Sequence, residues 1–175
     1  MNKDVLERAK KVKLLLLDVD GVLTNGEIVF DETGREIKFF HVTDGMGIKL
    51  LQKAGIKVGI ISSRYSKVTA IRAKELGIDI VFQGKFEKLE VFERVIKKLG
   101  LSKEEVAYIG DDWVDIPILK RVGLAVTVPN SQEPVKEFAH FVTSKEGGKG
   151  AVREVCDLIL KSQGKWQELL NYYLD

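Results

Sequence analysis

Short runs of Val, Ile and Leu without polar alternation recur along the chain, at residues 13–17, 57–61, 80–82, 106–109, 124–128 and 141–142. Strands that helices cover on both faces have this continuous apolar pattern. Apolar residues at three- and four-residue spacing predict helices over 47–54, 66–76, 85–99, 113–121 and 151–161. A glycine follows each of the first four, where a left-handed cap ends a helix: Gly55, Gly77, Gly100 and Gly123. The alternation predicts an α/β fold with a doubly wound parallel sheet.

Residues 27–40 break this pattern. Polar and apolar residues alternate over 27–30 and 36–40 around the turn sequence DETGR, which predicts an antiparallel hairpin that protrudes from the fold. Its apolar members are Ile28, Phe30, Ile37 and Phe39. Because an isolated two-stranded ribbon is marginal in water, we expect the parent domain or another subunit to cover it.

The composition indicates one globular domain over residues 1–175, with a polar tail at 163–175 that ends in aromatic residues. Lys and Arg number 28 against 26 Asp and Glu, and this near-balance excludes the basic footprint of a dedicated nucleic-acid binder. The apolar runs are far shorter than the roughly 18 residues of a membrane span, and the first residues lack the apolar core of a secretory signal. A lone cysteine, Cys156, lies in an apolar helical stripe, which predicts core packing and a reducing cytoplasm.

Two carboxylates follow the first predicted strand, in the sequence Asp18-Val19-Asp20-Gly21. Residues i and i+2 of an extended chain project to the same side, so the two acids are neighbours. Like charges so close resist joint ionisation unless a cation intervenes. With Mg²⁺ present, one carboxylate can serve as the nucleophile while the other carries a proton for the leaving group. The alternative is that one acid caps a turn and the other is solvated.

Three more acids, Asp111, Asp112 and Asp115, follow the fourth strand. An oxygen-rich cluster at a strand-to-helix junction suits a hard cation such as Mg²⁺. Helix capping by Asp111 or Asp112 explains one acid well and three poorly. We expect Asp115 to hold backbone groups or another carboxylate.

The second and third strands end in groups that can bind phosphate. Ser62 places a hydroxyl before a helix, although an ordinary capping serine would do the same. After the third strand, Lys85 or Lys88 can neutralise both phosphate and the crowded acids. Four parallel strands thus deliver Asp, Ser, Lys and Asp in order, which are the groups that phosphoryl transfer to an aspartate needs.

In these features the sequence resembles the haloacid dehalogenase superfamily of aspartate-nucleophile phosphatases. The motifs match as DVDGVLT at 18–24, ISS around Ser62, Lys88, and GDDWVD at 110–115. TDGMGIKLL at 43–51, QGKFEKL at 83–89 and GGKGAVREVCDLIL at 147–160 are similar to the 3-deoxy-D-manno-octulosonate 8-phosphate phosphatase family, which serves lipopolysaccharide assembly in Gram-negative bacteria. That family usually has Thr-Gly-Arg where this chain has Ser62-Ser63-Arg64, a change that bears on how the helix start approaches phosphate.

The resemblance implies a Mg²⁺-dependent phosphomonoester hydrolase. Asp18 would attack phosphorus and become an aspartyl phosphate, and Asp20 would protonate the leaving alcohol and then activate water. Mg²⁺ would be held by the side chains of Asp18 and Asp111 and by the backbone oxygen of Asp20. Ser62 and Lys88 would bind the phosphoryl oxygens.

The resemblance also implies residues that contact the sugar acid. Arg64 and Arg72 would face it, since a guanidinium binds carboxylate or phosphate bidentately, and plain surface arginines are the alternative. A polar segment would line the pocket, or be only a capped loop: Thr43, Asp44, Gly45, Met46 and Gly47.

No interval of the sequence has room for a cap domain, so we expect a capless fold in which either the substrate is large or another subunit closes the site. The resembled family forms homotetramers whose hairpins join and in which a neighbour's C-terminal tail reaches the site. Gly148 and its neighbouring glycines would allow close backbone approach, and Lys149 or Arg153 would meet an anionic substrate. A flexible loop before the last helix is the alternative.

Other functions remain open. The catalytic motifs do not separate an eight-carbon sugar acid 8-phosphate from a nine-carbon sialic-type sugar acid 9-phosphate. A receiver-like signalling domain that accepts phosphate, or an idle domain that assists a synthase, is a rival of a different class. Asp20 argues against the receiver, which lacks a second acid two residues beyond its nucleophile.

Overall fold

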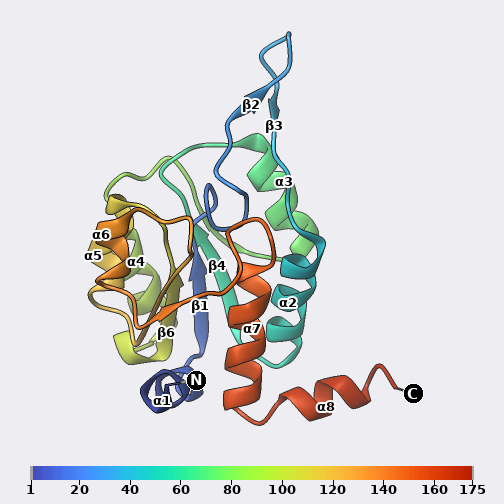
Figure 1. Ribbon diagram of the computed structural model, residues 1–175, viewed down its shortest axis with the longest axis vertical. Coiled ribbons are helices and arrows are strands. Elements are labelled where there is room, and N and C mark those ends of the chain that lie inside the picture. The colour runs from blue at the N-terminus through green and yellow to red at the C-terminus, as the bar shows by residue number, and fades with distance from the viewer. Residues whose placement is uncertain (1, 175) are drawn as a thin grey trace.

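One six-stranded sheet organises the computed structural model, which describes residues 2–174 (Figure 1). Met1 and Asp175, which the predicted domain 1–175 includes, lie outside the described residues. The strands pair in parallel in the order β5-β4-β1-β6-β7-β8. Their bounds are β1 Leu14–Leu17, β4 Lys57–Ile61, β5 Ile80–Phe82, β6 Val106–Ile109, β7 Leu124–Thr127 and β8 Phe141–Val142. They coincide with the six apolar runs to within one residue, which confirms the predicted parallel sheet.

Helices cover both faces of the sheet because both faces are apolar. On β1, Leu15 and Leu17 belong to one core and Leu14 and Leu16 to the other. The first core includes residues of α1 (Lys3–Lys10), α2 (Val42–Lys53), α3 (Lys67–Leu76), α7 (Ala151–Ser162) and α8 (Trp166–Asn171). The second includes residues of α4 (Lys88–Leu99), α5 (Ile116–Leu119) and α6 (Glu133–Lys136). Cys156 is fully buried in the first core, as its helical stripe predicted.

Three helix starts differ from the sequence prediction. Helix α2 begins at Val42, so residues 43–47 form its first turns and are not a capped loop. Helix α4 begins at Lys88, because Gly84 has a positive φ and the following residues stay in a loop. The segment predicted as a helix over 113–121 divides into a 3₁₀ turn, η2 (Trp113–Asp115), and the short α5. A second 3₁₀ turn, η1, spans Lys103–Glu105, and α8 lies in the tail that the sequence left unassigned.

Two kinds of glycine follow the helices. Gly55, Gly77 and Gly100 have positive φ, as a left-handed cap requires. Gly123 does not, and the capping prediction is wrong there. A Cβ at Gly123 would lie 2.2 Å from the backbone oxygen of Glu104, so this glycine is needed for close backbone packing.

The predicted hairpin is present and projects beyond the body of the molecule, at the top of Figure 1. It consists of β2 (Val29–Phe30) and β3 (Glu36–Ile37), paired antiparallel. Its four predicted apolar members are each 40% to 67% exposed. Among residues 2–174, no helix is both long and apolar enough to span a membrane.

The order of the strands fixes where a ligand can bind. The chain leaves β1 toward β4 and β5 on one side, then crosses to β6, β7 and β8 on the other. The direction of winding therefore reverses between β1 and β6, and the crevice at the carboxyl ends of two such strands is the usual ligand site of an open α/β sheet.

Candidate active site

Three carboxylates meet at the crevice between β1 and β6. Asp18 directly follows β1, and its backbone N–H donates to Ile109 O on β6 at 3.0 Å. Carboxylate oxygens of Asp18, Asp111 and Asp115 lie within 4.8 Å of one another. Gly21 lies against this cluster with φ +88°, and a Cβ there would come within 2.0 Å of Asp111 Oδ2. Glycine is therefore required at position 21 for both conformation and space.

The crowded acids resist ionisation. Burial, with Asp115 next in effect, raises the pKa of Asp18 to about 7 even though Lys88 opposes the shift. Burial and the nearby Asp18 and Asp115 raise the pKa of Asp111 to about 8. A cation between Asp18 and Asp111 would reverse this preference, because an opposite charge favours the ionised carboxylate.

Asp115 is the structural centre of the cluster. Its Oδ1 accepts hydrogen bonds from Lys88 Nζ at 2.7 Å and from the hydroxyl of Tyr108 at 2.6 Å. Its Oδ2 accepts from the backbone N–H groups of Asp111 at 2.9 Å and Asp112 at 3.1 Å. With four donors on a fully buried carboxylate, Asp115 has little capacity left for an ion. It holds the loop after β6 in place.

The remaining acids fit a divalent cation. Asp111 Oδ1 is buried and has no hydrogen-bond partner among the described residues. A buried carboxylate oxygen without a partner is costly unless an ion or water completes it. Asp18 and Asp111 together thus supply hard oxygen ligands of the kind that Mg²⁺ prefers. Asp112 is exposed, and its Oδ1 accepts from the N–H of Trp113 at 2.7 Å as the cap of η2.

The structure separates the two candidate lysines. The side chain of Lys88 is fully buried, with Nζ 2.9 Å from Asp18 Oδ2. Burial alone would lower the pKa of Lys88, but Asp18 and Asp115 raise it overall, so the ammonium stays charged. Lys85 is exposed in the preceding loop. Lys88 is therefore the lysine that lies at the acid cluster.

Ser62 is buried at the end of β4, and its Oγ accepts from the N–H of Arg64 at 3.3 Å. It does not cap the next helix, because Ser66 does so by accepting from Thr69 N at 3.1 Å. Ser63 Oγ is buried and has no partner among the described residues. Both hydroxyls lie on the loop at the carboxyl end of the sheet.

Asp20 lies in a ring of alternating charges. Lys38 Nζ contacts Asp20 Oδ1 and lies 3.3 Å from Glu36 Oε1. Arg64 closes the ring, with Nη1 3.3 Å from Asp20 Oδ2 and Nη2 3.1 Å from Glu36 Oε1. The sequence analysis missed Glu36 and Lys38. Their signal was in the alternation of β3, where they occupy the polar positions beside Ile37.

The first turns of α2 pack against two other helices. Asp44 is buried, burial raises its pKa, and its Oδ1 accepts from the N–H of Arg153 at 2.8 Å in the first turn of α7. Gly45 faces Arg72, since a Cβ would lie 2.4 Å from its Nη2. Gly47 likewise leaves space for the side chain of Arg153. These small residues allow α3 and α7 to approach α2.

Two further residues of this segment have local contacts. Thr43 Oγ1 lies 2.7 Å from His41 Nδ1, and Met46 is partly buried against the first core. Arg72 pairs with Glu75 at 2.8 Å and lies over the ring of Phe40. The structure therefore places Arg72 beside α2 and the base of the hairpin.

The glycine-rich segment before α7 packs on the loop after β1 of the same chain. A Cβ at Gly147 would lie 1.7 Å from Gly21 O, and Gly148 N donates to Val22 O at 3.0 Å. Asn130 joins the two loops, donating to Gly21 O at 3.1 Å and accepting from Gly147 N at 2.8 Å. Lys149 is exposed and pairs with Glu146. In this structure the two glycines therefore support their own chain's acid loop.

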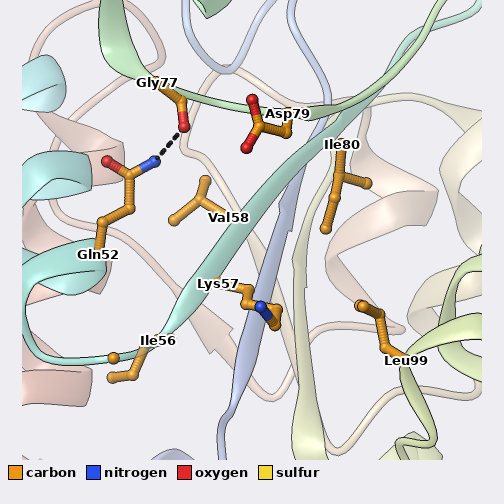
Figure 2. A pocket seen from close by; sticks show the side chains of 9 residues that line it. Gln52, Ile56, Lys57, Val58, Gly77, Asp79, Ile80 and Leu99 are labelled. Atoms are coloured by element: carbon orange, nitrogen blue, oxygen red, sulfur yellow. Dashed lines mark hydrogen bonds between the residues drawn. The ribbon is translucent and has the colours of Figure 1, made fainter.

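A separate hollow of about 480 Å³ lies at the amino ends of β4 and β5, away from the carboxyl ends where the acids lie (Figure 2). Its lining includes Gln52, whose Nε2 donates to Gly77 O, together with Lys57 and Asp79. Lys57 is the first residue of β4 and Asp79 directly precedes β5, whereas the acids lie after the last residues of β1 and β6. The hollow is distinct from the acid cluster.

Comparisons of the sequence with known proteins identify the family to which the chain belongs. Residues 51–155 match the family described as haloacid dehalogenase-like hydrolase. The 3-deoxy-D-manno-octulosonate 8-phosphate phosphatase of Escherichia coli strain K12 is 44% identical over 168 residues, which are 96% of this chain and 89% of that protein. This chain belongs to that phosphatase family.

Solved structures of the family superpose closely. The phosphatase from Yersinia pestis has a TM-score of 0.94 at 44% identity, covering 95% of this chain and 90% of that one. The phosphatase from Moraxella catarrhalis, in complex with magnesium, phosphate and 3-deoxy-D-manno-octulosonate (KDO), has a TM-score of 0.96 at 40% identity, covering 99% of each. The chain is thus a phosphatase of the haloacid dehalogenase fold, and the receiver-like alternative is set aside.

Proposed function

We propose that this phosphatase converts 3-deoxy-D-manno-octulosonate 8-phosphate to KDO and inorganic phosphate, a step of lipopolysaccharide biosynthesis. The observation that carries the proposal is the pairing of Asp18 and Asp111 across β1 and β6, in a chain 44% identical to phosphatases named for this substrate. A purified sample with Mg²⁺ should release phosphate from this sugar phosphate.

Each residue of the cluster has a proposed role. Asp18 attacks phosphorus, the bond to the ester oxygen breaks, and Asp20 gives that oxygen a proton. Asp20 then takes a proton from the water that hydrolyses the aspartyl phosphate. Ser62 and Lys88 bind the phosphoryl oxygens, whose charge the buried ammonium balances.

Mg²⁺ is the cofactor that this donor set fits. Asp18 and Asp111 would hold it with their side chains, together with the backbone oxygen of Asp20. When bound, it neutralises negative charge on the phosphoryl group and the nucleophile. Asp111 Oδ1, buried without a partner, supports this role.

Asp18→Asn and Asp20→Asn test the chemistry. Asp18→Asn should lower kcat by more than about 1,000-fold and form no phosphoenzyme, because the amide is a poor nucleophile. Asp20→Asn should slow both steps by about 100-fold or more. Circular dichroism should show both folded. Substantial turnover by Asp18→Asn would refute the nucleophile.

A nine-carbon sialic-type sugar acid 9-phosphate is the competing substrate within the same chemistry. Arg64 and Arg72 are the proposed contacts of the sugar acid, with residues 43–47 beside them. Comparing kcat/KM for the two sugar phosphates decides between them, and a higher value for the nine-carbon substrate would overturn the assignment.

We also propose that the working unit is a cytoplasmic homotetramer. The exposed apolar side chains of the hairpin support assembly, because their exposure to water is unfavourable. The lone buried cysteine fits a reducing compartment. Gly148 and Lys149 remain candidates for reaching a neighbour's site, and removal of residues after Thr143 with unchanged kcat/KM would exclude that role.

A further inference from the structure

In the charge ring around Asp20, one cationic side chain is buried and the other is partly exposed to solvent. The side chain of Lys38 is 1% exposed, whereas that of Arg64 is 37% exposed. Lys38 holds Oδ1 of Asp20, and Arg64 reaches Oδ2. Because long side chains on the surface exchange partners readily, the buried ammonium is the contact that stays when a substrate enters.

Glu36 fixes this ammonium. Its Oε1 lies between Lys38 and Arg64, and its Oε2 accepts from the hydroxyl of Ser66 at 2.5 Å. Ser66 in turn caps α3 by accepting from Thr69 N. The chain of contacts therefore runs from the rigid start of α3 through the base of the hairpin to Asp20.

Proton transfer to a leaving group requires a carboxyl oxygen in a defined direction. Asp20 directly precedes Gly21, and its carboxyl group can rotate about its side-chain bonds unless a neighbouring group holds at least one of its oxygens. Lys38 on Oδ1 leaves Oδ2 as the oxygen that can turn to the ester once Arg64 engages substrate. The neutral ring of two cations and two anions also lets a buried lysine remain without an unpaired charge.

We propose that Lys38, fixed by Glu36, is a positioning residue that orients the carboxyl of Asp20 for proton transfer to the leaving oxygen. This inference rests on the proposed phosphatase chemistry. In the step, the P–O ester bond breaks as the Asp18–phosphorus bond forms, and the proton of Asp20 moves to the ester oxygen to give the alcohol. Lys38 itself exchanges no proton.

The test compares two leaving groups in the Mg²⁺-loaded enzyme. An alkyl sugar phosphate needs a proton on its leaving oxygen, whereas p-nitrophenyl phosphate does not. In both cases kcat/KM reports only phosphoryl transfer to Asp18, so the later hydrolysis does not enter. Lys38→Met should lower kcat/KM about 100-fold for the alkyl phosphate and much less for the aryl phosphate.

Further variants separate positioning from other roles. Lys38→Arg should restore part of the loss, and Glu36→Gln should give a smaller loss with the same leaving-group dependence. The double variant Lys38→Met with Asp20→Asn should be no slower than Asp20→Asn alone, since both changes remove one function. Arg35→Met is the matched control, because Arg35 lies on the same hairpin, 79% exposed, and pairs with Asp31.

The outcomes are decisive in either direction. Equal losses in kcat/KM for both leaving groups would overturn the proposal by showing a structural or substrate-binding role. Thermal unfolding checks that each variant is folded. If Lys38→Met fails to fold, Lys38→Arg and Glu36→Gln test the proposal by the ratio of their kcat/KM losses for the alkyl and the aryl phosphate. If the wild type hydrolyses other alkyl phosphates but not the octulosonate phosphate, the substrate proposal fails. The ratio of kcat/KM losses for an alkyl and an aryl phosphate then still tests the role of Lys38.

Discussion

The ammonium of Lys88 lies 2.9 Å from Oδ2 of Asp18, although the two residues are 70 positions apart in the sequence. The same ammonium lies 2.7 Å from Asp115 Oδ1, so one buried cation contacts two buried carboxyl groups. Removing one member of such a cluster leaves the others without compensation. The charge of each of these three side chains therefore affects the stability of the other two in the folded protein.

Replacing Lys88 should harm both activity and stability. Lys88→Met should lower kcat/KM by roughly 100-fold or more, because a phosphoryl-oxygen donor is lost. Without Mg²⁺ at pH 8, it should lower the free energy of unfolding by about 3–5 kcal/mol, as measured by urea denaturation. Lys85→Met, at an exposed position in the loop that precedes α4, should change stability by less than about 0.5 kcal/mol. Equal effects of the two variants would contradict this assignment.

The stabilisation by Mg²⁺ should grow as pH rises from about 6 to about 8. The pKa values of Asp18 and Asp111 are raised to about 7 and about 8, from an ordinary value of 3.8. The metal-free folded state thus binds more protons than the unfolded state between about pH 4 and pH 8, and these groups make it less stable as pH rises. Mg²⁺ competes with those protons, so it binds better at higher pH.

Thermal unfolding with and without Mg²⁺ across this range measures the effect. Asp111→Asn should remove most of the metal-dependent shift. A Mg²⁺ shift that is constant from pH 6 to pH 8 would contradict the coupling between protons and metal.

Because Gly147 packs against Gly21, a substitution at Gly147 should affect catalysis although this residue lies outside the sequence motifs that contain the acids. Gly147→Ala places a Cβ against the backbone oxygen of Gly21 and must displace the loop that carries Asp20. Because a misplacement of about 1 Å can lower a rate about 100-fold, kcat should fall by that order.

Gly123→Ala is the matched control for this variant. It creates a similar collision, 2.2 Å from Glu104 O, at a position that does not support the acid loop. It should lower thermal stability and leave kcat of the folded enzyme unchanged. Equal kcat losses in the two variants would show that the effect is general.

The hairpin should control assembly. Phe30→Glu replaces an exposed apolar side chain of the hairpin with a charge and should shift the proposed tetramer toward monomers, as seen by sedimentation velocity. Ile71→Glu makes the same kind of change at an exposed position on α3 and should leave the distribution intact. A Phe30→Glu protein that sediments like the wild type would remove the hairpin from the interface.

The sheet could be predicted from the sequence because its strands are buried on both faces. The four consecutive leucines of β1, between Lys13 and Asp18, match the short apolar run of a strand that is buried on both faces. The site could be located for the same reason, since Asp18 and Ser62 directly follow buried strands and Asp111 lies two residues after another. Gly77 and Gly100 likewise marked their helix ends through a local backbone requirement.

Contacts between distant segments could not be read from the chain. Lys38 contacts Asp20, and Glu36 contacts Lys38, only because the chain returns from the hairpin beside the loop that follows β1. The first two turns of α2 contain two glycines, which disfavour helix, yet packing against α3 and α7 needs them there. Here tertiary contacts override local propensity.

The pleat of the hairpin links two properties of the enzyme. Glu36 and Lys38 turn toward the catalytic loop, while Ile37 and Phe39 between them turn to solvent. Inserting or deleting one residue in this ribbon would exchange the two sets and lose both at once. Natural variation in its length should therefore occur in steps of two residues, because such steps keep both sets of side chains on their own faces of the ribbon.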